Sequence, residues 1–220
     1  MTKTELIELI DIGVLRYDLV AKYPTFLNLA LREIQNLRSW SFMKKRDIFP
    51  ITSGTSVLTL PANFKELQNL RPPVHIRLSD PSFGTFVYKP VTVVTENQER
   101  ARIWSFGAVT WDARLSLKKE GTTATLELVD LASEDLNFEV KYYQYLPDLT
   151  ADSDESSIAN AYPWMVVTKA KEHAFRAIND FTMVEAMREE FMSADGKGGL
   201  FREAVRQDSR VDIAGLDTRM

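Results

Sequence analysis

Apolar residues recur at helical spacing at both ends of the chain and alternate like strand residues in the middle. Near the start, Leu6 and Ile10 lie on one face of a predicted helix. Thr2 and Glu5 in front of it have the spacing of a capping box. A second helix is predicted to begin at Pro24, because proline suits the first turn of a helix. Its apolar stripe consists of Leu27, Ala30, Leu31, Ile34 and Leu37.

The middle of the chain is composed of short runs rich in β-forming residues. Residues 42–51 and 57–60 flank Thr52-Ser53-Gly54-Thr55, which predicts a β-hairpin with Gly54 at a positive φ. In the run 137–145, Phe138, Val140 and Tyr142 share one face. Further strands are predicted in 66–70, 74–78, 114–119 and 123–128, and a short surface helix in 95–102.

Helical spacing returns after residue 160. The stripe of this region consists of Val166, Ala170, Ala174, Ala177, Ile178 and Phe181, and its alanines permit close helix packing. Met183, Met187 and Phe191 continue it in a following helix. Glycines at 196, 198 and 199 then break the pattern before an apolar stripe resumes at Leu200.

These changes of period predict an α+β fold. The N- and C-terminal segments form a helical bundle, and an antiparallel β-rich domain is inserted between them. We expect helices of the bundle in residues 1–41 and 161–208, and the inserted domain in 42–147. The acidic segment 148–160 is interpreted as a linker, and 209–220 as a flexible or partner-ordered tail.

The composition of the chain excludes several kinds of binding and catalytic site. The 220 residues are 45% hydrophobic, enough for a substantial core, and carry a formal net charge of -4, so no global attraction to DNA or anionic membrane is expected. The chain has no cysteine, which excludes disulfides, thiolate zinc sites and a cysteine nucleophile. No signal peptide or membrane-spanning run is recognised, so we expect a soluble protein kept in cytoplasm-like conditions.

Candidate motifs for phosphate and calcium binding both fail on their spacing. Gly196-Lys197-Gly198-Gly199 has the wrong order for a P-loop and is interpreted as a helix break. Asp152, Asp154 and Ser156 resemble the first ligands of a calcium loop. However, Ser157 stands where the loop requires glycine and Pro163 where it requires glutamate, so a solvated linker is favoured.

Catalytic and metal-binding patterns are also lacking in the sequence. The histidines, His75 and His173, have no metal-ligand spacing, and His173 is interpreted as a residue at the edge of a helix stripe rather than a base. No serine lies in a Gly-x-Ser-x-Gly elbow. Carboxylates that folding brings together stay possible, but no catalytic, cofactor-binding or metal residue is predicted.

Two features are instead typical of contact surfaces. Arg202, Arg206 and Arg210 recur every four residues, and two interpretations stay open. The stripe is either a solvated face balanced by Glu203 and Asp208, or a docking site for an acidic partner. An aromatic group in a loop-rich stretch favours either core packing or an exposed protein–protein patch. It consists of Phe83, Phe86, Tyr88, Trp104, Phe106 and Trp111.

The helix and hairpin of the first third carry a family resemblance. Arg16-Tyr17-Asp18-Leu19 leads into Pro24-Thr25-Phe26-Leu27-Asn28-Leu29-Ala30, followed by a turn, a short strand and the ending Leu60-Pro61-Ala62-Asn63-Phe64. A Tyr-rich strand in 140–145 and a helix containing Trp164 follow more loosely. In this order, over residues 4–192, the chain resembles the bacteriophage head–tail adaptor family, also called head-completion or connector proteins.

The resemblance implies a structural virion protein without enzymatic activity. Such adaptors form a ring, typically of twelve copies, on the portal protein, and tail or head-closure proteins dock below. DNA passes through the channel without sequence-specific binding, and no membrane is involved. The expected location is the head–tail junction of a virion made in the host cytoplasm, with the arginine stripe at the portal. The alternatives are a tail-tip or baseplate structural protein, a nucleic-acid-binding module and a small enzyme.

Overall fold

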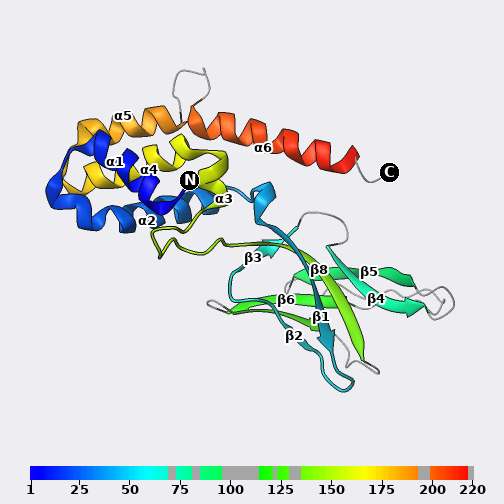
Figure 1. Ribbon diagram of the computed structural model, residues 1–220. Helices are drawn as coiled ribbons and strands as arrows, with labels where there is room; N and C mark the ends of the chain where they lie inside the picture. Colours follow the sequence, from blue (N-terminus) through cyan, green and yellow to red (C-terminus); the bar gives the residue numbers. More distant parts are fainter. Residues whose placement is uncertain are drawn as a thin grey trace. The chain divides into compact units, whose positions relative to one another are not determined.

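Contacts divide the chain into two compact units in the computed structural model. The structure describes residues 1–68, 73–80, 85–95, 114–120, 123–128, 135–192 and 199–217. The helical unit comprises Met1–Met43 and Leu146–Met220, and the β unit comprises Lys44–Tyr145 (Figure 1). The predicted α+β class, with helices from both ends of the chain and an inserted β-rich region, is confirmed.

The helical unit is built around α4. Its elements are α1 (Lys3–Val14), η1 (Tyr17–Lys22), α2 (Tyr23–Leu37), η2 (Ser41–Met43), α3 (Ser157–Ala161), α4 (Pro163–Ala177), α5 (Phe181–Met192) and α6 (Leu200–Asp217). Helices α1, α2 and α5 all pack against α4, where Ala170 and Ala174 are fully buried and allow close approach. The predicted capping box is present, because the Thr2 amide donates to Glu5 at 2.8 Å and the Glu5 amide to Thr2 at 3.3 Å.

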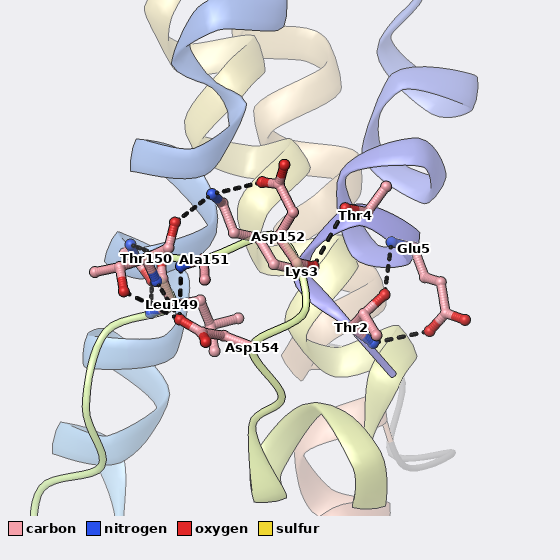
Figure 2. Close-up of polar contacts among 10 residues, drawn as sticks. Thr2, Lys3, Thr4, Glu5, Leu149, Thr150, Ala151, Asp152 and Asp154 are labelled. Carbon is pink, nitrogen blue, oxygen red and sulfur yellow. Dashed lines mark hydrogen bonds and ion pairs between the residues drawn. The ribbon is translucent and has the colours of Figure 1, made fainter.

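The segment predicted as a linker, 148–160, is bonded to the helical unit and includes α3 near its end. The Lys3 side chain donates to the Thr150 carbonyl at 2.8 Å and pairs with Asp152 at 3.1 Å (Figure 2). Asp154 accepts bonds from the amides of Thr150 and Ala151, both at 2.7 Å, and these bonds lower its pKa. The start of α1 is therefore held by Lys3 and by main-chain bonds from Lys3 and Thr4 to the carbonyls of Asp154 and Asp152.

Helix α6 covers most of the segment expected to be a tail. Helix α6 extends to Asp217, so residues 209–217 of the expected flexible or partner-ordered tail are helical. The helix predicted in 95–102 and the break at 196–198 lie outside the described residues, apart from Thr95, which ends a strand. Among the helices of the described residues, none is long and apolar enough to cross a membrane.

The β unit is an eight-stranded sheet in the order β1-β8-β4-β5-β6-β7-β2, with β3 also pairing with β8. Its strands are β1 (Lys44–Ile51), β2 (Val57–Thr59), β3 (Phe64–Leu67), β4 (Val74–Asp80), β5 (Thr85–Thr95), β6 (Arg114–Glu120), β7 (Thr123–Leu128) and β8 (Leu136–Gln144). The β5–β6 pair is parallel, which the expected antiparallel domain did not include. The other described pairs are antiparallel.

The predicted hairpin of 42–60 is wrong in its pairing. The turn forms as expected, with Gly54 at φ 82° and the Thr55 amide bonded to the Thr52 carbonyl at 3.1 Å. However, β1 pairs with β8 and β2 pairs with β7, so the turn connects the two end strands of the sheet. Ile51 and Leu58 are both buried in the core of this sheet. Burial of these side chains favours pairing with β8 and β7 over pairing of β1 with β2.

Strands that follow different parts of the sequence share one core. Phe138, Val140 and Tyr142 of β8 face inward, as their alternation predicts, and each is buried. Residues from every strand of the sheet join them in one apolar cluster, so the sheet is curled around it. The first residue of β1, Lys44, pairs with Tyr143 near the end of β8. The β unit therefore begins and ends on neighbouring strands.

Candidate assembly surfaces

The predicted arginine stripe lies along α6. Arg202 and Arg206 are exposed, and Arg206 forms an ion pair with Glu203. Gln207 donates a hydrogen bond to the same carboxylate at 2.9 Å. The side chain of Arg210 lies outside the described residues, although the helix continues through its backbone. Two of the three guanidinium groups are thus placed on an exposed helix surface.

Asp208 has a different position from the predicted one, because it is buried instead of balancing the stripe in solvent. Its carboxylate accepts a bond from the Ser41 amide at 3.1 Å and a second from the Ser41 hydroxyl. It also pairs with Arg38 at 3.4 Å, and that guanidinium lies 5.7 Å from the ring centre of Trp40. Asp208 therefore fixes α6 to the segment that follows α2.

The predicted aromatic patch is described in part. Phe86 and Tyr88 of β5 are both partly exposed, whereas Phe83, Trp104, Phe106 and Trp111 lie outside the described residues. The guanidinium carbon of Arg77 lies 3.5 Å from the ring centre of Phe86, and that of Arg46 lies 5.8 Å from the ring centre of Tyr88. Such cation–π contacts hold both rings against cationic groups.

A buried carboxylate pairs with Arg46, the same residue that contacts Tyr88. Glu139 of β8 is buried, with Arg46 at 2.5 Å and Lys141 at 3.8 Å. His75 pairs with Glu139 in the ladder, and burial followed by the charge of Lys141 lowers its pKa. We call this surface the basic–aromatic face. It consists of Arg46, His75, Arg77, Phe86, Tyr88, Glu139 and Lys141.

The basic–aromatic face has an excess of cationic groups. Arg46, Arg77 and Lys141 stand against the single carboxylate of Glu139. Among the described residues, the Arg77 Nε and His75 Nδ1 atoms are buried without a hydrogen-bond partner. A surface with an excess of positive charge and with aromatic rings suits a partner that carries carboxylates.

Large apolar side chains are exposed where α1 meets η1. Ile12 is 69% exposed, Leu15 75% and Tyr17 92%, and Val20 is also exposed. Leu15 has a left-handed backbone, with φ 51° and ψ 42°. The following Arg16 forms a two-pronged bond with Asp18, at 2.8 and 2.9 Å. We call Ile12, Leu15, Tyr17 and Val20 the apolar corner.

A network of ion pairs joins α2, α4 and α5. The buried Glu172 accepts from Lys169 at 2.7 Å, Arg176 at 2.5 Å and Arg188 at 2.9 Å. Burial alone would raise the pKa of Glu172, but the bonds from Lys169 and Arg188 outweigh it and lower the pKa. Glu33 of α2 pairs with Lys169 at 2.9 Å, and lies 3.3 Å from the imidazole of the buried His173.

A cavity of about 540 Å³ opens beside this network. Its lining combines charged residues of α4 and α5 with apolar residues at the ends of α2 and α5. Leu37 and Met192 of this lining are 52% and 57% exposed. The lining residues are Leu37, Lys169, Glu172, Arg188, Glu189, Phe191 and Met192.

The family of the chain follows from a comparison with models of known protein families. A family model described as SU10 adaptor protein matches residues 1–216. The chain belongs to this family. The match confirms the resemblance to head–tail adaptors that the sequence predicted.

Among individual proteins, this SU10 adaptor family member has a distant likeness to a solved structure. A chain from the solved structure described as "Neck of empty GTA particle computed with C6 symmetry" is 13% identical, with a TM-score of 0.26. The alignment covers 70% of this chain and 66% of that chain, just under two thirds of its length. At this TM-score the likeness carries no argument. Comparison with curated protein sequences finds no match.

Three carboxylates of this adaptor were missed by sequence reasoning, which expects charged groups in solvent. Only the burial of Asp208 could have been predicted from the sequence. Asp208 follows Ala204 at helical spacing, so both lie on the same face of α6, and both are buried. Glu139 and Glu172 are buried by partners from other elements. Their environment arises only when strands or helices far apart in the sequence come together.

Proposed function

We propose that the protein is a structural adaptor between the head and the tail of a virion, without a catalytic role. It forms a ring below the portal protein, and tail or head-closure proteins dock onto that ring. The proposal is carried by the match of the SU10 adaptor family over residues 1–216. Ring assembly further requires that copies of the chain bind one another through exposed surfaces, and the apolar corner supplies one.

The proposed ring has twelve copies and lets DNA pass through its channel. The formal net charge of -4 supports passage rather than binding, because a negative wall repels phosphate and limits adhesion of DNA. DNA would therefore be conducted without sequence-specific contacts.

The end of α6 is proposed to bind the portal through Arg202, Arg206 and Arg210. Two of these guanidinium groups are exposed on a helix that Asp208 anchors, so their position is set before binding. Arginine forks suit carboxylates on a partner. The portal surface that they meet is expected to be acidic.

The basic–aromatic face is proposed as the docking surface for the protein below the ring. Its support is the excess of cationic groups over Glu139 and the partly exposed rings of Phe86 and Tyr88. Aromatic and arginine side chains are the residues that most often dominate the energy of protein–protein contacts.

Reconstitution with purified portal of the same particle tests the assembly. The expected result is a closed ring on the portal by electron microscopy, and a matching mass by mass photometry. Replacing Arg202 and Arg206 with glutamate should weaken attachment while leaving the fold intact. A control with the exposed Lys45 and Lys119 replaced by glutamate changes the net charge equally and should attach normally. A protein that stays monomeric at high concentration and ignores the portal refutes the proposal.

A separate measurement tests the lower contact. Arg77→Ala and Tyr88→Ala are expected to weaken binding of the tail or head-closure protein to preformed rings, with portal attachment unchanged. Val57→Ala serves as the control, because Val57 is a similarly exposed residue on an end strand outside the face. Equal binding by all three variants refutes the assignment of this face.

A further inference from the structure

We propose that the apolar corner of one copy inserts into the cavity of the next copy, with Tyr17 as the inserted side chain. The inference rests on the proposed ring, because it names the contact between neighbouring subunits. The corner and the cavity belong to the same helical unit. Each copy then offers a corner on one side and receives one on the other.

The corner has the properties of an inserted group. Tyr17 and Leu15 are 92% and 75% exposed, so packing within the chain does not account for their apolar surface. Leu15 holds a left-handed conformation as the C-cap of α1, where its amide donates to the Asp11 carbonyl at 2.8 Å. The backbone at Arg16, which lies between Leu15 and Tyr17, is held by two kinds of contact. The Arg16 side chain is bonded to Asp18, and the Tyr23 hydroxyl donates to the Arg16 carbonyl at 3.2 Å. The side chains are therefore presented on an ordered segment.

The cavity matches a tyrosine in chemistry and size. Leu37, Phe191 and Met192 supply apolar lining suited to the ring, and charged residues complete the lining. Glu189, an exposed residue of this lining, is an acceptor for a tyrosine hydroxyl. Tyrosine is favoured in such places because one end is apolar and the other polar. The volume of about 540 Å³ lies in the range of about 300–1,000 Å³ that holds small organic molecules, so it is large enough for a tyrosine side chain.

The placement of the two surfaces excludes an internal contact and favours a ring. The corner precedes the first residue of α2, Tyr23, and the cavity includes its last residue, Leu37. The 15 residues of α2 span about 22 Å, so a straight helix holds the two surfaces apart. A contact between two different surfaces of identical copies is heterologous, and it gives a ring where the rotation between neighbours closes and an open filament where it does not. The occupant of the cavity is therefore a second copy of this chain.

The absence of cysteine from the chain makes a crosslinking test clean. Two single variants, Tyr17→Cys and Met192→Cys, are mixed, assembled on the portal and mildly oxidised. The expected product is a disulfide-linked dimer that contains one copy of each variant, with neither variant crosslinking alone. The double variant should give a ladder of covalent oligomers. Tyr17→Cys mixed with Thr59→Cys is the control, because Thr59 is exposed on β2.

The outcomes separate this inference from the proposed function. Rings that assemble on the portal without the mixed crosslink overturn the inference and leave the adaptor proposal standing. Absence of any assembly by the unaltered protein on the portal overturns both. A Tyr17→Cys dimer formed without the second variant indicates corner-to-corner pairing and overturns the inference alone.

A second variant tests the contact without chemistry. Leu15→Asn preserves the local backbone, since asparagine tolerates the left-handed conformation, and is expected to raise the concentration needed for assembly at least tenfold. Leu29→Asn is the control, because Leu29 is a partly exposed apolar residue of α2 outside both surfaces. A change below twofold for Leu15→Asn overturns the inference.

Discussion

Replacing Asp208 with alanine is expected to release the second half of α6 from the helical unit. The first half is held by apolar burial, with Ala204 buried and Phe201 stacked on Phe191 at 5.6 Å. The bonds of Asp208 to Ser41 and its ion pair with Arg38 hold the later turns. Without the carboxylate, the Ser41 amide loses its acceptor and Arg38 loses its anion.

The cost follows from these contacts. Hydrogen bonds to a charged acceptor contribute about 1.5–3 kcal/mol each, and removing one partner of a buried ion pair costs about 3–5 kcal/mol. Arg38 is 27% exposed and keeps a bond to the Ser209 hydroxyl at 3.1 Å, so solvent and this neighbour recover part of the loss. We expect Asp208→Ala to lose about 3 kcal/mol, and Asp208→Asn, which retains an acceptor, about 1 kcal/mol.

Hydrogen exchange resolved by segment measures this loss directly, because the two units need not unfold together. A loss of 3 kcal/mol corresponds to about 100-fold faster exchange of the amides after residue 208, with residues 200–205 less affected. Asp152→Ala is the control, since this carboxylate is 85% exposed and should change stability by less than about 1 kcal/mol. Unchanged exchange in α6 of the alanine variant refutes the anchoring role of Asp208.

Three further predictions concern single residues. Burial lowers the pKa of His173 from 6.5, although the charge of Glu33 opposes this shift. The unfolded chain therefore binds the proton at a higher pH than the folded chain does, and the stability of the fold decreases as the pH drops below 6.5. Thermal unfolding of His173→Gln between pH 7 and 5 should therefore depend less on pH than that of the parent protein. Gly54→Ala should lose about 1 kcal/mol in urea unfolding of the β unit, because alanine is strained at the φ of 82°. No atom lies within 4 Å of the new methyl group, so the loss comes from the backbone and not from a clash. Gly13→Ala should gain about 0.5–1 kcal/mol, since the new methyl meets only the flexible end of Lys171; a loss of stability contradicts this reasoning.

Local features of the fold were predictable from sequence because neighbouring residues determine them. The capping box of Thr2 and Glu5, the buried stripe of α2 and the positive φ of Gly54 each depend on a few adjacent positions. The partners of β1 and β2 were not predictable in this way. Lys44 pairs with Tyr143, and the choice depends on which faces the whole sheet buries.

The candidate surfaces were predictable only as residue types. The arginines of α6 and the aromatic residues of β5 were recognised, but their neighbours were not. Arg77 stacks on Phe86 because β4 pairs with β5. The cavity requires α2, α4 and α5 together, and Glu172 is buried there by an arginine from another helix. No periodicity within one segment encodes such a meeting of three helices.

The pairing of Lys44 with Tyr143 makes the β unit an exchangeable module. Paired strands lie about 5 Å apart, so the points where the chain enters and leaves the sheet are close together. A deletion of Lys44–Tyr145, closed by a short glycine-serine bridge, would not stretch the helices on either side. During evolution, one helical scaffold could thus acquire different inserts and serve different neighbours without redesign of its own core.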